Sequence, residues 1–248
     1  MKQSYILLAT AAALASAACN AEKGGESTAG SSIKAEAVKP PADGDWSTIV
    51  TPTSQGGFMM GNPNAKVKLV EFGSLTCPHC RDFDEKGVPP LIETYVKSGK
   101  VSFEFRNYVR DPFDISAALI ARCNGAKSFF PLTRALFKAQ PEWVGKIQTV
   151  PQAQLEGVTN LGPDKQFLEI AKLADLQTWA AMRGVPTAKS AKCLTDQEAV
   201  NQLVQMNSDA TNQYNLPGTP TFLINGKMVD NVAAWEALEP KLREAIGG

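Results

Sequence analysis

Two cysteines separated by two residues form the most reactive arrangement in this sequence, Cys77-Pro78-His79-Cys80. A disulfide needs Cβ atoms about 4 Å apart, and residues three apart on a helix have Cβ atoms about 5–6 Å apart. A slightly tightened helical turn therefore lets Cys77 and Cys80 pair without rearranging the fold. Both the dithiol and the disulfide become accessible in one scaffold, which a redox catalyst requires.

The position of the pair predicts which sulfur reacts. Cys77 follows a predicted strand and begins a predicted helix, so the free N–H groups and the dipole of that helix stabilise a thiolate there. A thiolate with a lowered pKa is the attacking sulfur and the better leaving group. Pro78 fits the first helical turn, where its missing N–H is no loss. His79, the one histidine of the chain, can direct a hydrogen bond or a positive charge toward the Cys77 thiolate.

Two other interpretations of the pair are weaker. A zinc site needs about four ligands, yet the chain has one histidine and its other cysteines lie far from the pair in sequence. A purely structural disulfide would rarely occupy the first turn of a helix after a buried strand. The favoured interpretation is a redox-active pair, with no metal or cofactor.

The N-terminus has the pattern of an export signal. Lys2 is followed by an apolar stretch over residues 5–15, too short to span a membrane, and by the small residues Ser16-Ala17-Ala18. We expect residues 1–18 to be a signal peptide and the protein to act in the periplasm or another extracytoplasmic space. Cys19 is a candidate lipid-attachment site that would tether the protein to a membrane. Ordinary cleavage near this position without lipidation is the alternative.

The next segment predicts a tether followed by the start of a fold. Residues 19–45 are rich in glycine, serine and proline and poor in large apolar side chains, which is typical of a flexible linker. The folded part is expected to begin near Trp46, with two short strands at residues 47–51 and 58–60.

A strand–helix–strand unit carries the cysteine pair. Residues 66–72 have apolar side chains on both faces, which predicts a central strand covered on two sides. The helix that begins near Cys77 is expected to be interrupted at residues 87–90, Gly-Val-Pro-Pro, because proline cannot continue its hydrogen bonds. The next strand is expected at residues 101–109, parallel to the first through a right-handed crossover.

The remaining chain is helical first and returns to strands at its end. From Asp111 to Tyr214 the pattern is helical, with a long helix expected at residues 163–181 and a capping box at Thr195–Glu198. Strands return around Asn225-Gly226, the strongest short hairpin signal, and a final helix is expected over residues 232–246. Because strands follow the helices, the helices interrupt one α/β sheet domain.

Together these features resemble the DsbA family, strongest at residues 70–80 and at Pro217-Gly218-Thr219-Pro220-Thr221-Phe222, within a match from about Gly61 to the C-terminus. The resemblance implies an α/β thioredoxin-like fold, a central mixed sheet flanked by helices, with an inserted all-helical domain. The expected division is 46–110 and 215–248 for the thioredoxin-like domain and 111–214 for the insert.

The resemblance also implies roles for three further residues. Pro220 matches the family's cis-proline opposite the cysteines, whose loop pairs with an extended substrate; an ordinary trans proline is the alternative. Thr219 departs from the valine of the best-known members, which leaves partner choice and oxidising strength open. Glu71 matches the buried acid that relays the proton of Cys80. It shares a strand face with apolar neighbours, so burial is expected independently, and an exposed glutamate is the alternative.

Cys123 and Cys193 both lie in the expected insert. We expect them to pair and to close a loop of about 70 residues, which the chain-entropy estimate values at on the order of 4 kcal/mol. Two buried free thiols are the alternative.

The sequence therefore predicts an exported dithiol oxidase that acts on unfolded or reduced exported proteins. By resemblance, a quinone-linked membrane partner would reoxidise it. Lys and Arg balance Asp and Glu at 25 each, so nothing in the charge argues for nucleic acid. The rivals are a reductase or isomerase kept reduced by a membrane electron donor, and a peptide-binding or chaperone-like module. Metal delivery is the most distant alternative.

Overall fold

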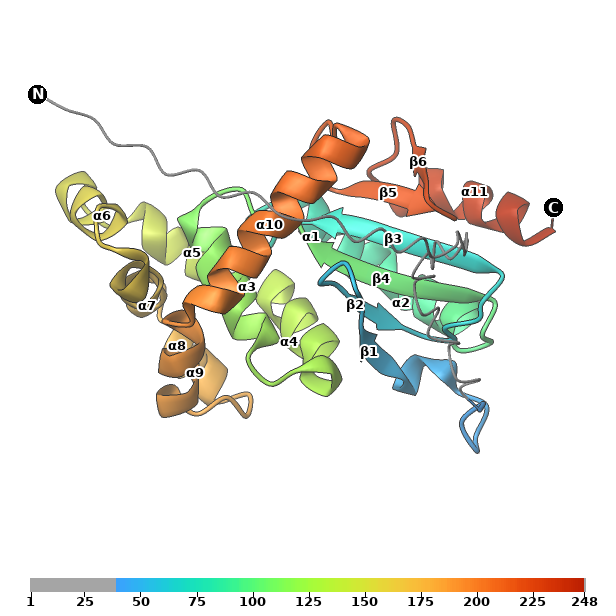
Figure 1. Cartoon of the computed structure of the whole chain (residues 1–248), viewed down its shortest axis with the longest axis horizontal. Coiled ribbons are helices and arrows are strands. Elements are labelled where there is room, and N and C mark those ends of the chain that lie inside the picture. Colours follow the sequence, from blue (N-terminus) through green and yellow to red (C-terminus); the bar gives the residue numbers. More distant parts are fainter. Residues whose placement is uncertain (1–38, 248) are drawn as a thin grey trace, which may run out of the picture. The chain divides into compact units, whose positions relative to one another are not determined.

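A six-stranded mixed sheet, in the strand order β1-β2-β4-β3-β5-β6, organises the computed structural model (Figure 1). The structure describes residues 39–247. The expected signal peptide, Cys19 and most of the expected tether lie outside the described residues. Within residues 39–247, no helix combines the length and the apolar character that crossing a membrane requires.

The two central strands are parallel and the outer ones antiparallel. β3 (Val67–Gly73) pairs with β4 (Val101–Asn107) along its whole length. The other strands, all antiparallel to their neighbours, are β1 (Val50–Pro52), β2 (Phe58–Met60), β5 (Thr221–Ile224) and β6 (Lys227–Val229). The turn between β5 and β6 has positive φ at Asn225 and Gly226, which hairpin turns of this kind require. The predicted hairpin and the predicted fold class are confirmed.

The crossover from β3 to β4 is a broken helix. It consists of α1 (Pro78–Lys86), α2 (Val88–Leu91) and a π-helical turn (Ile92–Val96). Gly87 ends α1 just before Pro89 and Pro90, whose missing N–H groups cannot continue its hydrogen bonds. The predicted interruption is confirmed.

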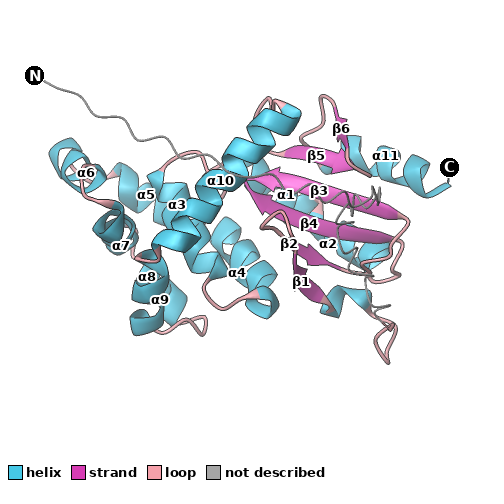
Figure 2. Ribbon diagram, viewed as in Figure 1, coloured by secondary structure: helices cyan, strands magenta, loops and turns pink. Residues whose placement is uncertain are grey.

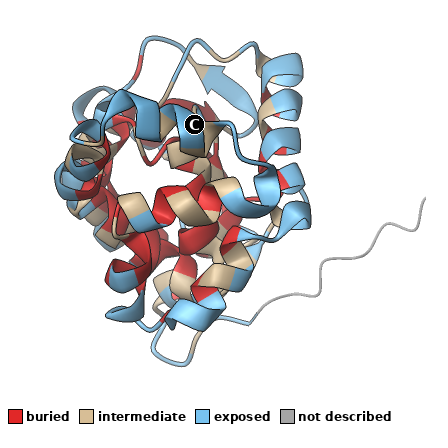
Figure 3. Ribbon diagram, turned by 90° about the vertical axis from the view of Figure 1, so that its left-hand side faces the viewer, coloured by how far each residue is buried: buried red, intermediate tan, exposed pale blue. Residues whose placement is uncertain are grey.

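Residues 112–214 fold as helices and their connections. The helices are α3 (Pro112–Arg122), α4 (Ala126–Lys138), α5 (Gln140–Gln148), α6 (Gln152–Thr159), α7 (Pro163–Leu173), α8 (Leu176–Ala181), α9 (Thr187–Leu194) and α10 (Gln197–Tyr214). We call them the helical group; α3 to α9 gather to one side of the sheet, and α10 runs back to contact β4 (Figure 2). Seen from that side, buried faces turn inward and exposed faces outward (Figure 3). The last helix, α11 (Trp235–Gly247), contacts β3.

Phe129 of α4 joins the helical group to the sheet. Its ring stacks on Phe58 of β2 with centroids 4.2 Å apart and lies 5.9 Å from the ring of Phe105 in β4. All three rings are buried in one continuous apolar cluster. Removing such surface from water is the main favourable contribution to folding, so the helical group and the sheet stabilise each other.

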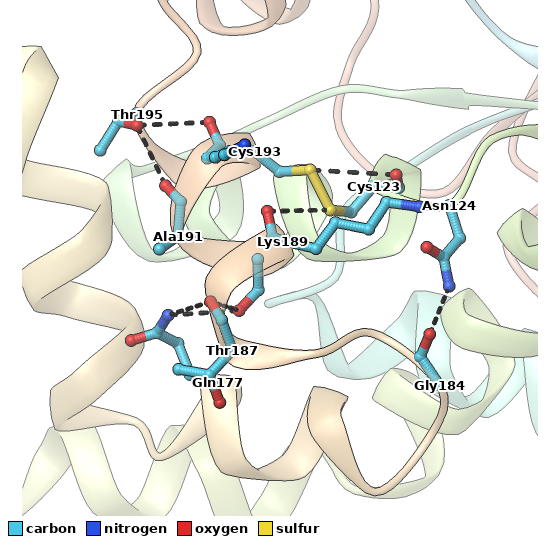
Figure 4. Close-up of a disulfide and its surroundings, with 11 residues drawn as sticks. Cys123, Asn124, Gln177, Gly184, Thr187, Lys189, Ala191, Cys193 and Thr195 are labelled. Atoms are coloured by element: carbon cyan, nitrogen blue, oxygen red, sulfur yellow. Dashed lines mark hydrogen bonds between the residues drawn. A yellow bond between two sulfur atoms is a disulfide. The ribbon is translucent and has the colours of Figure 1, made fainter.

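A disulfide joins Cys123, just after α3, to Cys193 of α9 (Figure 4). The sulfurs are 2.01 Å apart and the Cα atoms 5.7 Å apart, across 70 positions of sequence. Next to it, the side-chain amide of Asn124 donates a hydrogen bond to the carbonyl oxygen of Gly184 at 2.9 Å. The pairing is the one expected from the sequence, and it closes the part of the chain that contains α4 to α8.

Three predicted element boundaries are wrong. The strand expected at residues 47–51 begins only at Val50, because the Asp45 side chain caps a short helix over Trp46–Thr48. The strand expected to reach Val109 ends at Asn107, because the Val109 N–H donates to the side chain of Asn207 in α10 instead of to the sheet. The final helix begins three residues later than expected, at Trp235.

Two predictions within the helical group are also corrected. The long helix expected at residues 163–181 is divided into α7 and α8 at Asp175, which has a left-handed backbone (φ 57°) and an ion pair with Lys146 at 2.8 Å. The cap of α10 is Asp196 rather than Thr195. Asp196 accepts from two N–H groups of the first turn, since aspartate is a stronger cap than threonine.

Candidate active site

Cys77 caps the N-terminus of α1, immediately after the loop that leaves β3. Its backbone is extended (φ −84°, ψ 121°), and Pro78 begins the helix. Both Cys77 and Cys80 are free thiols; Cys77 is 2% exposed and Cys80 0%. The pair thus lies at a strand-to-helix junction, with Cys77 in the N-cap position of α1.

The surroundings of Cys77 favour a thiolate. Its pKa is lowered from 9.0 to about 4, chiefly by a hydrogen bond from the Cys80 thiol. Burial opposes this effect, whereas the Thr219 side chain and the N–H groups of Cys80 and His79 lower the pKa of Cys77 further. The sulfur is therefore ionised at neutral pH.

Cys80 has the opposite electrostatic environment. Burial raises its pKa well above the ordinary value, and its hydrogen bond to Cys77 and the nearby charge of Glu71 raise it further. The Ser74 N–H points at its sulfur at 3.5 Å. The reduced pair is accordingly a Cys77 thiolate beside a Cys80 thiol.

A loop 142 positions later in sequence lies against Cys77. The peptide bond between Thr219 and Pro220 is cis, and the Thr219 carbonyl oxygen accepts a hydrogen bond from the Cys77 thiol at 3.2 Å. The Thr219 hydroxyl is buried and makes no hydrogen bond with the described residues in this thiol form, so it is available to the thiolate. A cavity of 510 Å³ beside the loop is lined by residues that include Gly218, Pro220 and Met228. An extended peptide there would find backbone groups to pair with.

Glu71 lies on β3 beneath the cysteines and is 2% exposed. Its Oε1 atom has no hydrogen-bond partner among the described residues. Burial raises the pKa of Glu71 well above its ordinary value, and the charges of Asp84 and Cys77 raise it further. The carboxyl group therefore holds a proton close to the sulfurs.

Replacing Glu71 by glutamine is expected to stabilise the reduced protein at neutral and alkaline pH and to slow exchange by roughly tenfold or more. The raised folded-state pKa means that the folded protein holds this proton more tightly than the unfolded chain does. Wild-type stability therefore falls as pH rises from the unfolded-state pKa toward the folded-state one. Glutamine does not titrate and escapes this loss. Denaturant unfolding at a series of pH values measures the difference.

Glu104→Gln is the matched control, because Glu104 is a buried glutamate on the neighbouring strand that pairs with Arg106 at 2.7 Å. It is expected to lose stability and to keep its exchange rate. A Glu71→Gln protein with the exchange rate and pH profile of wild type would remove Glu71 from the proton transfer.

His79 differs from the sequence-based expectation. Its side chain is exposed, and its contribution to Cys77 comes from its backbone N–H. A residue just inside a helix N-terminus directs its N–H toward the cap while its side chain projects outward. The peptide group of His79, rather than its imidazole, acts on the sulfur.

Four residues of this region have contacts that the sequence pattern does not predict. Asp84 of α1 is 7% exposed, has its pKa raised by burial to about 6, and lies 3.6 Å from Arg134 of α4. The others are Ser74, Asp114 and Gln140, which meet at the loop before Cys77. Asp84 could have been identified from the sequence, because it lies one helical turn after Cys80 on the same predicted helix. The other three gain significance only through contacts between distant segments.

Comparisons with known proteins find a matching family model and several similar structures. A family model described as Thioredoxin matches residues 53–243. The crystal structure of a protein-disulfide isomerase from Novosphingobium aromaticivorans is 34% identical, with a TM-score of 0.74, and the match covers 77% of this chain and 97% of that one. Wolbachia pipientis α-DsbA1 is 21% identical with a TM-score of 0.61 over 76% of this chain and 90% of that one, a likeness of fold.

A relative found by sequence comparison also has a name that describes thiol–disulfide chemistry. A Rickettsia bellii protein, whose name describes a protein-disulfide oxidoreductase, is 26% identical over 178 residues, which are 71% of this chain and 60% of that protein. The chain thus spans about 60% of that relative's length.

Proposed function

This chain belongs to the thioredoxin family, in its DsbA-like group, and on that basis we propose that it is a thiol:disulfide oxidoreductase that donates its Cys77–Cys80 disulfide to other proteins. The observation that carries the proposal is the opposite ionisation of the two sulfurs, with the pKa of Cys77 lowered to about 4 and that of Cys80 raised. A sulfur that is stable as a thiolate leaves readily from a disulfide. The difference between the two pKa values therefore favours transfer of the Cys77–Cys80 disulfide to a substrate protein.

The proposed reaction has two exchanges. A substrate thiolate attacks Cys77 Sγ of the oxidised enzyme, and the Cys77–Cys80 bond breaks to leave a mixed disulfide. Cys80 departs as a thiolate and takes a proton from the neutral carboxyl of Glu71. A second substrate thiolate then attacks the substrate sulfur of the mixed disulfide and releases Cys77 as its stable thiolate. The substrate loses two electrons and the enzyme gains them.

The proposal also includes where the protein acts and which partners it has. We infer an extracytoplasmic location, with residues 1–18 as signal peptide and Cys19 as a candidate lipid anchor. The substrates would be reduced or unfolded exported proteins, and a quinone-linked membrane protein would restore the disulfide. The boundaries 46–110, 111–214 and 215–248 are kept as the proposed division between sheet domain and insert.

A reductase or isomerase is the second candidate. It is favoured by the name of the Novosphingobium relative, a protein-disulfide isomerase, and by Thr219, which departs from the family's best-known pattern. Such an enzyme would be kept reduced by a membrane electron donor. The direction is decided by the redox equilibrium of the cysteine pair.

The reduced protein is expected to be more stable than the oxidised protein at pH 7, and the pair to be at least about tenfold more oxidising than glutathione, ~30 mV. Because the folded-state pKa of Cys77 is depressed to about 4, its contribution is complete above the unfolded-state pKa and is lost as pH falls through about 4. The disulfide form has no such group. Thermal unfolding of both forms across pH, with a glutathione equilibrium at pH 7, tests both statements.

The outcomes separate the two candidates. A stability difference that shrinks toward pH 4, with an oxidising equilibrium, supports the disulfide donor. A potential near or below that of glutathione would favour the reductase or isomerase.

A further inference from the structure

The loop between β3 and α1 holds the contacts that orient both sulfurs. We call residues 74–77 the junction loop. The Ser74 N–H points at Cys80 Sγ at 3.5 Å, and the Ser74 carbonyl oxygen accepts a hydrogen bond from the Cys77 N–H at 3.1 Å. A shift of this loop would therefore move Cys77 relative to the N–H groups of α1.

Asp114 reaches the junction loop from the helical group. It lies in the first turn of α3 and is fully buried. One carboxylate oxygen accepts from the Leu75 N–H at 2.8 Å, and the other from the Ser74 hydroxyl at 2.5 Å and the Arg110 N–H at 3.0 Å. The N-cap residue of α3 is Asp111, whose side chain accepts a hydrogen bond from the Asp114 N–H at 2.8 Å. The Asp114 carboxyl group is thus available to bind the loop.

Gln140 reaches the same loop from the start of α5. It is 4% exposed. Its side-chain Nε2 donates to the carbonyl oxygen of Leu75 at 2.8 Å and to that of Cys77 at 3.0 Å. Both amide hydrogens are used on the junction loop.

We propose that Asp114 and Gln140 are positioning residues through which the helical group sets the reactivity of the cysteine pair. Burying a carboxylate and a carboxamide is unfavourable unless each is hydrogen-bonded. Four of the five side-chain hydrogen bonds just described end on the junction loop, so these groups act mainly on that loop rather than within their own helices. The inference deepens the proposed function, because it concerns the geometry of the same sulfurs whatever the direction of electron flow.

The consequence for the chemistry follows from the helix N-terminus. The N–H groups of His79 and Cys80 stabilise the Cys77 thiolate only while Cys77 stays in the capping position. If the loop loses its anchors, the pKa of Cys77 is expected to rise by about one unit, which changes the glutathione equilibrium constant about tenfold toward a less oxidising pair. The apolar core, which these residues do not form, is left in place.

The experiment uses the whole protein with Asp114→Asn and Gln140→Met. Asparagine keeps the shape of Asp114 but offers one acceptor oxygen in place of two, and methionine keeps the bulk of Gln140 without its donors. Ser116→Ala is the matched control, because Ser116 is also buried in α3 but donates only to the carbonyl oxygen of Pro112. The Cys77 pKa is read from the absorbance of the thiolate, and the equilibrium constant from glutathione mixtures. Circular dichroism verifies the fold of each variant.

The expected result is a raised Cys77 pKa and a shifted equilibrium constant in both folded variants, with wild-type values in Ser116→Ala. Folded variants would overturn the proposal if their Cys77 pKa is that of wild type and their glutathione equilibrium constant stays within about twofold of the wild-type value. If Asp114→Asn does not fold, Ser74→Ala replaces it, since it removes the hydroxyl that contacts Asp114 and Thr76 and keeps the Ser74 backbone contacts. The wild-type constant alone tests the proposed function, whereas the difference between variant and wild type tests this inference.

Discussion

Replacing Cys77 by serine is expected to abolish thiol–disulfide exchange, lowering its rate by at least about 10³-fold. The hydroxyl of serine cannot form a disulfide. It also stays protonated where the Cys77 thiolate, with its pKa lowered to about 4, is ionised. The measurement is the rate at which a reduced, unfolded test protein acquires disulfides in the presence of the enzyme and an oxidant. Activity that survives the substitution would favour the peptide-binding module over the redox enzyme.

The companion variant, Cys80→Ser, separates the roles of the two sulfurs. Its serine hydroxyl can still donate a hydrogen bond to the Cys77 thiolate, so attack on a disulfide-bonded substrate is expected to proceed. No thiol remains to resolve the product, and a mixed disulfide through Cys77 is expected to accumulate. Non-reducing electrophoresis and mass spectrometry detect it. A mixed disulfide formed by Cys77→Ser but not by Cys80→Ser would show that the assignment is reversed.

Much of this site could be predicted because its signals are local. The spacing of Cys77 and Cys80 and the helix that begins between them follow from adjacent residues. The hairpin after Pro220 follows from the single dipeptide Asn225-Gly226 and its positive φ values. The broken crossover follows from two prolines. In each case the physical cause lies within a few residues of its effect.

The environment of the junction loop could not be predicted in the same way. Asp114 lies 40 positions from Ser74, and Gln140 lies 65 positions from Leu75. In the sequence, an aspartate near a helix start resembles an ordinary capping residue, and a single glutamine has no chemical signature. Only the packing of the helical group against the sheet gives either residue a partner.

His79 shows a different limit of local reasoning. Its place between two cysteines predicts that its imidazole acts on the sulfur, because neighbours in sequence are expected to have neighbouring side chains. The geometry of a helix N-terminus separates the two, since it directs N–H groups toward the cap and side chains outward. The hydrogen bond attributed to the side chain is supplied by the peptide group.

Removing the disulfide between Cys123 and Cys193 by a double serine substitution is expected to lower the free energy of unfolding by on the order of 4 kcal/mol. The estimate rests on the sequence separation of 70 residues, because a cross-link across a long loop removes entropy from the unfolded chain. For a protein of this size the melting temperature should fall by roughly 10 °C. Thermal and denaturant unfolding are to be compared with Cys77 and Cys80 in the same redox state in both proteins.

The same double variant is expected to leave the Cys77 pKa and the glutathione equilibrium unchanged at temperatures where it is folded. The disulfide ties the end of α3 to α9, whereas Asp114 and Gln140 reach the junction loop from the first turns of α3 and α5. Phe129 packs α4 against the sheet, and α4 in turn contacts both α3 and α5, independently of the cross-link. A loss of exchange activity in a folded double variant would mean that the cross-link also maintains the active site. A stability change below about 1 kcal/mol would mean that strain or residual structure in the unfolded chain cancels the entropic contribution.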